Sequence, residues 1–158
     1  MTQEEKQLLF KDLCARLSYG VRIAYKENEH DIHHWTLCTL HAPHTSKDGS
    51  IIDIGSDGWI EYVEYPGAGM ETASRPLHLE KMLPYLRPMS SMTPDERKEY
   101  DKLIANCLYD AEAYFFENFN RLSNWLNEHH FDFRGLIEKG LALKASEEMY
   151  KDIHTGLI

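Results

Sequence analysis

Cysteine pairs and long hydrophobic runs are both missing from this sequence. Its three cysteines are odd in number and form no CxxC pair, so neither a disulfide framework nor a thiolate zinc site is predicted. No segment approaches the ~20 consecutive apolar residues of a membrane span, and the first residues lack the apolar run of a signal peptide. We therefore expect a cytoplasmic protein that does not partner a membrane.

Positive charge is also scarce. Lys and Arg number 17 against 26 Asp and Glu, which gives a formal net charge of −9 at pH 7. This acidic balance opposes the neutralisation of phosphates that supplies most non-specific affinity for nucleic acids. We expect no direct binding of DNA or RNA.

The common sequence signatures of catalysis are absent as well. The chain has no GxSxG elbow, no P-loop, no GxGxxG fingerprint and no HExxH helix, so the nucleophilic, phosphate, dinucleotide and zincin chemistries lack their starting signal. We expect no enzyme, no catalytic residue and no cofactor.

Histidine is plentiful, and it supports an alternative function: a small metal-dependent or acid–base enzyme. Five of the nine histidines lie close together, at positions 30, 33, 34, 41 and 44. On one strand His33 and His41 would stand about 26 Å apart at ~3.3 Å per residue, too far for ligands that lie ~2.1 Å from one ion. Pairing of His41 with His44, or of His30 with Asp31 and His33, stays open. Solvated histidines are the favoured interpretation, so no metal site is expected.

The patterns that are present predict one domain over residues 1–158, since ~100 to 200 residues is the usual domain size. Thr2 and Glu5 form a capping box that begins a helix over residues 3–18, and Gly20 suits its end.

Residues 20–90 are expected to be rich in strands. Apolar and polar residues alternate, or apolar residues cluster, over 21–27, 32–41, 51–54 and 59–65, with a hairpin turn at 55–58. A short strand over 77–80 and a single helical turn over 81–85 follow. This order predicts an α+β fold: a small SH3-like β-barrel or a curled antiparallel sheet, packed by an N-terminal helix and one or two long C-terminal helices.

Residues 94–130 carry the strongest helical pattern. Thr93 is a good N-cap, Pro94 suits the first helical position and Glu96 completes a capping box. One apolar face then runs through Ile104, Leu108, Ala111, Phe115, Phe119, Leu122 and Leu126. The helix is continuous or two helices meet near Asp110. The segment 131–152, with glycines at 135 and 140, is expected to turn and pack.

Three stretches of this chain resemble a known group of sequences. They are LLFKDLCARL at 8–17, LPYLRPMSSMT at 83–93 and WLNEHHFDFRGLIEKGLAL at 125–143, and they are similar to small uncharacterised acidic proteins of Bacteroides genomes, their phages and mobile elements. The resemblance implies an accessory protein of a phage or mobile element, and it supplies no catalytic residue.

Candidate binding residues fall into two groups. Tyr114, Phe116 and Trp125 lie off the apolar stripe, so we expect an aromatic surface that binds a protein, most simply another copy of this chain. For His130, Asp132 and Arg134 two interpretations stay open. They are expected either to line a small polar pocket that holds a general base and an orienting carboxylate, or to form a buried hydrogen-bond network that locks the C-terminal segment in place.

The acidic residues of 94–130 support a third function, that of an acidic decoy. Their carboxylates would mimic phosphates and so inhibit a host defence protein that acts on nucleic acids. Basic residues interleave with them, at Arg97, Lys98, Lys102 and Arg121, which favours an ordinary solvated helix face. A non-enzymatic protein-binding accessory protein is therefore the favoured function.

Overall fold

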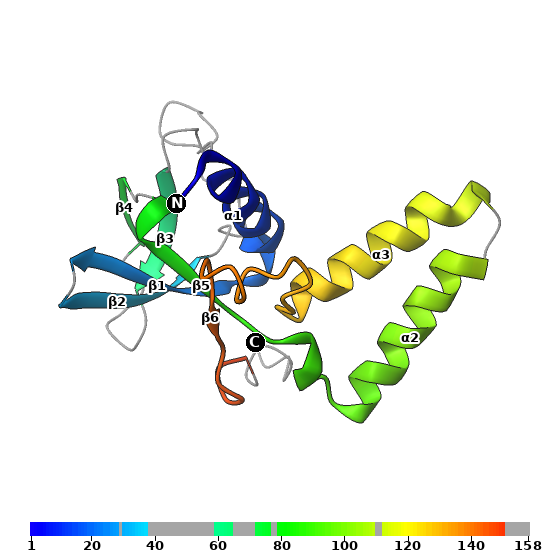
Figure 1. Cartoon of the computed structure of the whole chain (residues 1–158). Coiled ribbons are helices and arrows are strands. Elements are labelled where there is room, and N and C mark those ends of the chain that lie inside the picture. Colours follow the sequence, from blue (N-terminus) through cyan, green and yellow to red (C-terminus); the bar gives the residue numbers. More distant parts are fainter. Residues whose placement is uncertain (29, 38–58, 65–71, 77–78, 110–111, 151–158) are drawn as a thin grey trace.

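The computed structural model of the chain describes residues 1–28, 30–37, 59–64, 72–76, 79–109 and 112–150. These residues form an α+β structure, as expected. A sheet lies beside the N-terminal helix α1, and two further helices, α2 and α3, project away from the sheet as a hairpin (Figure 1).

The N-terminal helix begins where the capping box predicts. Helix α1 spans Gln3–Arg16 and a 3-10 turn, η1, follows over Leu17–Tyr19. The backbone N–H of Thr2 donates to Glu5 Oε2 at 2.7 Å, and Glu5 N–H donates to Thr2 Oγ1 at 3.2 Å. Gly20 ends the turn with φ of 68°, a left-handed conformation that favours glycine.

Six strands form one sheet in the order β4-β3-β2-β1-β5-β6. Their bounds are β1 Val21–Asn28, β2 Asp31–Leu37, β3 Trp59–Glu64, β4 Thr72–Pro76, β5 Met82–Leu86 and β6 Leu143–Lys144. Neighbours pair antiparallel except β5 and β6, which are parallel. Ile23 at the centre of β1 stands opposite Trp35 on one side and Pro84 on the other.

The expected SH3-like barrel is not supported, because the sheet formed by the described strands is open. Its edges are β4 and β6, and among the described residues these two do not pair. Strand β5 returns to the side of β1 instead of extending the β3–β4 edge, and the two-residue β6 then ends the sheet. The alternative expectation was a curled antiparallel sheet; the described strands form an open sheet that is antiparallel except between β5 and β6.

Two local predictions in this region have different outcomes. Of the hairpin over 51–65, only the second arm is described, as β3, and residues 51–58 lie outside the described ranges. The strand predicted over 77–80 and the helical turn over 81–85 were assigned in the wrong order. A 3-10 turn, η2 (Leu79–Lys81), comes first, and β5 follows. In β5 the residues Met82, Pro84 and Leu86 are buried in alternation, so packing on β1 decides the conformation there.

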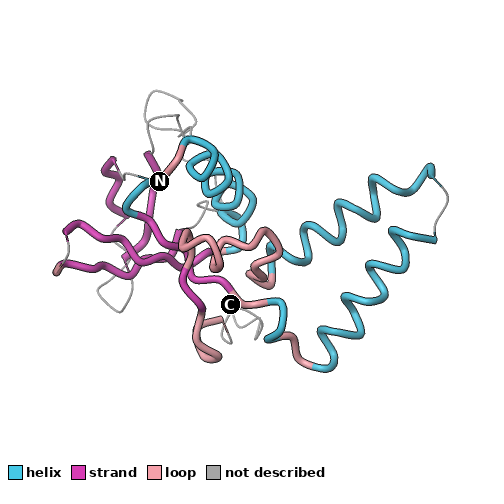
Figure 2. Tube along the Cα trace, in the orientation of Figure 1, coloured by secondary structure: helices cyan, strands magenta, loops and turns pink. Residues whose placement is uncertain are grey.

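The long helical region contains two helices, the second of the two alternatives. After a 3-10 turn, η3 (Met89–Ser91), helix α2 spans Pro94–Tyr109, a further 3-10 turn, η4, covers Glu112–Tyr114, and α3 spans Phe115–Glu128. The helices run antiparallel (Figures 1 and 2). We call α2, η4 and α3 together the arm, and the rest of the described chain the body.

Two hydrophobic clusters hold these parts together. The first joins α1, β1, β5 and the C-terminal segment, with Leu9, Leu13, Ile23, Met82, Leu86 and Leu136 fully buried. The second lies at the base of the arm around Leu122, Trp125, Leu126 and Phe131. The segment after α3 runs mostly as loop between arm and sheet (Figure 2), and it turns at Gly135 and Gly140, whose φ values are 69° and 70°. Leu136, Leu141 and Ala142 of this segment are buried in the first cluster.

Candidate interaction surface

The far end of the arm exposes a group of large apolar side chains. Six of the eight exposed large hydrophobic residues in the described chain lie there, between 46% and 84% exposed. We call these six residues the aromatic end: Leu108, Tyr109, Tyr114, Phe115, Phe116 and Phe119.

Three rings of the aromatic end contact one another. Phe115 packs edge-on against Phe116, with ring centroids 5.8 Å apart, and stacks on Phe119 at 6.2 Å. Since these three rings are in contact while staying about half exposed or more, they form a continuous apolar surface on α3.

The exposure arises because the apolar stripe of α3 is longer than the surface that covers it. Toward the body, Leu122, Trp125 and Leu126 are buried. Met89, Met92, Tyr100, Leu103, Ile104, Cys107 and Phe133 pack partly buried against them. Phe115 and Phe119 continue the stripe beyond this cover, at 46% and 53% exposed. On α3, the apolar face predicted from the sequence is therefore buried only in the half nearer the body.

The three aromatic residues predicted to bind are separated by the structure. Tyr114 and Phe116 are 59% and 77% exposed, on the aromatic end. Trp125 is only 7% exposed, and its ring stacks on His129 at 4.2 Å and on Phe131 at 5.6 Å. Trp125 thus belongs to the core at the base of the arm and not to its surface.

Four residues of the aromatic end were not predicted as site residues: Leu108, Tyr109, Phe115 and Phe119. One signal could have found the first two. Residues 103–109 carry no charged side chain, which is unusual for the exposed end of a surface helix and typical of the core of an interface.

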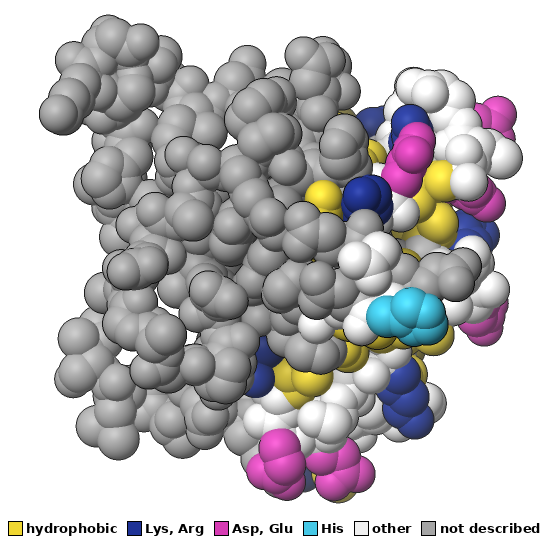
Figure 3. Space-filling view, turned by 90° about the vertical axis from the view of Figure 1, so that its left-hand side faces the viewer, with side chains coloured by type: hydrophobic (Ala, Val, Ile, Leu, Met, Phe, Trp, Pro, Cys, Tyr) yellow, Lys and Arg dark blue, Asp and Glu magenta, His cyan; other side chains and the backbone are white. Residues whose placement is uncertain are grey.

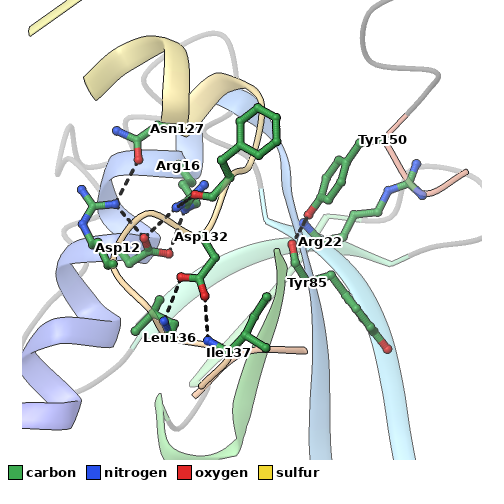
Figure 4. A network of polar contacts seen from close by, with 11 residues as sticks. Asp12, Arg16, Arg22, Tyr85, Asn127, Asp132, Leu136, Ile137 and Tyr150 are labelled. Atoms are coloured by element: carbon green, nitrogen blue, oxygen red, sulfur yellow. Dashed lines mark hydrogen bonds and ion pairs between the residues drawn. The ribbon is translucent and has the colours of Figure 1, made fainter. Parts of the chain in front are cut away.

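Asp132, of the second predicted group, lies in a polar network between α1 and the segment after α3 (Figure 4). The carboxylate of Asp132 accepts hydrogen bonds from the backbone N–H of Leu136 at 2.8 Å and of Ile137 at 2.9 Å. His130 is fully buried, with Nε2 3.1 Å from the carbonyl oxygen of Tyr19 and its ring stacked on Tyr150 at 4.0 Å. This arrangement favours the locking network over the catalytic base.

Arg134 joins the same network through a carboxylate that sequence reasoning missed. Asp12 is fully buried, and its carboxylate accepts three hydrogen bonds. One comes from Arg134 Nη1 at 2.7 Å, and two come from Nε and Nη2 of Arg16, at 2.8 and 2.9 Å. Burial lowers the pKa of Arg134, and the charge of Asp12 opposes this effect. The four-residue spacing of Asp12 and Arg16 beside Leu9 and Leu13 was the available signal.

Two further contacts of this network reach the arm and the C-terminal segment. Arg16 Nη2 donates to the carbonyl oxygen of Phe131 at 2.8 Å, and Arg134 Nη1 donates to Asn127 Oδ1 of α3 at 3.1 Å. A separate clamp involves Tyr150, whose hydroxyl donates to the carbonyl oxygen of Tyr85 at 2.7 Å and accepts from Arg22 N–H at 3.1 Å. These hydrogen bonds connect α1, α3, the segment after α3 and the sheet, which indicates a structural role for the region.

The base of the arm is fixed by Arg87. Its guanidinium binds Glu96 of α2 in bidentate fashion, at 2.7 and 2.8 Å, and lies over the ring of Phe131 at 4.3 Å. Burial alone would raise the pKa of Glu96, but hydrogen bonds and charge from Arg87, with the hydrogen bonds of Thr93, lower it to about 2. Glu96 is therefore ionised and paired at neutral pH.

Carboxylates elsewhere on the arm have basic neighbours. Asp95 lies 3.6 Å from Lys98, and Glu117 binds Arg121 at 2.8 Å, both pairs being exposed to solvent. This pairing favours the solvated helix face over a phosphate mimic.

The side of the body turned away from the arm shows acidic, basic and hydrophobic side chains intermixed among its described residues (Figure 3).

The described residues offer no metal cluster. In the part of the chain that the structure describes, no group of three or more His, Cys, Asp and Glu could hold a metal ion. His41 and His44 lie outside the described ranges, so their pairing stays an open alternative. Over those same described ranges, no helix is long and apolar enough to cross a membrane.

The chain matches no protein-family model, no curated protein and no solved structure. A functional interpretation therefore depends on the chemistry of the arm.

Proposed function

We propose that this chain is a non-enzymatic accessory protein that acts by binding another protein through the aromatic end of its arm. One observation carries the proposal: six large apolar side chains, 46% to 84% exposed, gathered at the end of a helical hairpin. The resemblance of residues 83–93 and 125–143 to proteins of Bacteroides phages and mobile elements suggests the setting, the cytoplasm of a host bacterium.

The size of the patch supports a protein partner. Phe and Tyr each offer roughly 150–250 Å² for burial, so the aromatic end exposes on the order of 700 Å² at the exposures observed. The largest apolar patch on a typical monomer is roughly 300–600 Å². A standard protein interface buries about 800 Å² on each partner, which the aromatic end nearly supplies by itself.

The chemistry of the patch supports the same class of partner. Tyr and Phe are enriched in interface cores, from which charged residues are depleted. A surface that stacks single-stranded nucleic acid also uses aromatic rings, but it adds a positively charged groove for the backbone. On α3 the nearest described basic side chain, Arg121, is already bound to Glu117 at 2.8 Å. The aromatic end therefore suits a protein better than a nucleic acid.

The test is a comparison of captured proteins between matched variants. Tagged parent protein, Phe116→Asp and Ile32→Asp are each used to capture partners from a lysate of the source organism. Ile32 is also exposed, at 45%, but belongs to β2, which lies across the molecule from the arm (Figure 1). We expect a protein retained by the parent and by Ile32→Asp, and lost with Phe116→Asp.

Circular dichroism melts should show that all three proteins are folded. The proposal is overturned if no protein, a further copy of this chain included, depends on Phe116 for its capture. A partner retained equally by all three proteins would place binding on another surface and would contradict the role of the aromatic end.

A further inference from the structure

We infer that the partner at the aromatic end is a second copy of this chain, and that the two arms pack side by side and antiparallel. This inference rests on the proposed function and names the occupant of the same surface. Three features support it: the area of the patch, the charges around it, and the direction in which the apolar stripe runs.

The area argues for a symmetric contact. In a twofold dimer both copies contribute the same patch, so the aromatic end, on the order of 700 Å² per copy from roughly 150–250 Å² per ring, approaches the ~800 Å² per partner of a standard interface. No further surface of the body has to be recruited.

The charges argue for side-by-side packing. Each copy has a net charge of −9, so two copies repel at a distance. Along α3, however, Glu117 and Arg121 neutralise each other, and residues 103–109 of α2 carry no charge. A contact along these sides of the two arms therefore brings few like charges together.

The stripe on α3 sets which side chains meet. Phe115 and Phe119 lead from the aromatic end toward the buried Leu122 and Leu126. When two arms overlap with opposite directions, these two rings of each copy come to lie near the twofold axis. Phe116 and Tyr109, at 77% and 84% exposed, then flank them. The result is a four-helix arrangement whose apolar seam continues the core at the base of each arm.

The inference is tested by measuring mass against concentration, using light scattering and sedimentation of untagged parent, Phe116→Asp, Tyr109→Ser and the control Ile32→Asp. We expect a reversible dimer for the parent and for Ile32→Asp. Loss of one such aromatic anchor should weaken the dimer by roughly 30-fold or more. Circular dichroism establishes that each variant is folded. Two arm variants are used so that, if one of them does not fold, the other still tests the dimer.

Salt tests the apolar nature of the contact. Raising the ionic strength screens repulsion between acidic copies, so a side-by-side apolar contact should persist or tighten modestly. A dimer that is lost at high salt would contradict this contact and indicate that charged groups hold the two copies together.

The outcomes also separate this inference from the proposed function. A parent that stays monomeric at every concentration refutes the second copy, as does a dimer indifferent to both arm variants. If a different protein is then captured in a Phe116-dependent way, binding by the aromatic end still stands. If neither a dimer nor such a capture is found, both proposals fail.

Discussion

At the scale of single residues, Glu96 has two functions at the base of the arm. Its carboxylate accepts from the backbone N–H of Thr93 at 2.7 Å, which completes the cap of α2, and it pairs with Arg87. The same side chain therefore starts the helix and ties it to the body.

Stability should fall when Glu96 takes up a proton. The pKa of Glu96 is lowered from 4.5 to about 2 in the folded chain, so its contribution is present above pH 4.5 and is lost as the pH falls toward 2. Glu96→Gln keeps a capping side chain but not the charge. We expect this variant to melt below the parent near pH 6, and the gap to shrink toward pH 2. A gap that does not change with pH would contradict the ion pair.

Asp12 is the residue whose loss should cost most. It is fully buried and shared by the guanidinium groups of Arg16 and Arg134. Removing one partner of such a buried set leaves uncompensated charge and typically costs ~3–5 kcal/mol. We expect Asp12→Asn to lower the free energy of unfolding by about that amount in urea titrations.

The exposed Asp95, 3.6 Å from Lys98, provides the control for Asp12. Surface pairs contribute ~0–1 kcal/mol, so Asp95→Asn should have little effect on unfolding. Equal losses for the two variants would mean that the Asp12 network does not hold α1 to the segment after α3.

At the scale of elements, the start of α2 can be tested directly. Glu96 N–H donates to Thr93 Oγ1 at 3.2 Å. Thr93→Ala removes this acceptor and should cost about 1 kcal/mol, measured as a lower melting temperature, while Thr93→Ser keeps the hydroxyl and should stay close to the parent. An unchanged melt for Thr93→Ala would mean that the hydroxyl does not stabilise the helix.

Helix ends were predictable from the sequence because capping depends on neighbouring residues. The capping boxes at Thr2 and Thr93 and the start of α2 at Pro94 all occur as expected. The order of η2 and β5 was not predictable in this way, since the strand at Met82–Leu86 is set by pairing with β1, about 60 residues earlier. Closure of the sheet depends on long-range pairing too, and local patterns do not encode it.

The candidate site was predictable only in part, for a related reason. The apolar stripe from Phe115 to Leu126 has one helical period throughout. Its pattern therefore does not show which of its residues are covered by other parts of the protein. Burial of Trp125 and exposure of Phe119 are decided by what packs at the base of the arm. Sequence reasoning therefore anticipated the exposure of Tyr114 and Phe116, misplaced Trp125, and missed the Asp12 network that Arg134 joins.

At the scale of the whole molecule, the chain leaves the body and returns to it at nearly one point. Arg87 N–H donates to the carbonyl oxygen of His130 at 2.8 Å, and Asp132 N–H donates to the carbonyl oxygen of Arg87 at 2.7 Å. The segments on either side of the arm are thus joined to each other by backbone hydrogen bonds where the arm meets the body. Closing a longer or shorter loop changes the entropy of closure only slowly, by about 0.6 kcal/mol for each doubling of length. Changes in the length or sequence of the distal part of the arm should therefore leave the pairing of β1 and β5 intact.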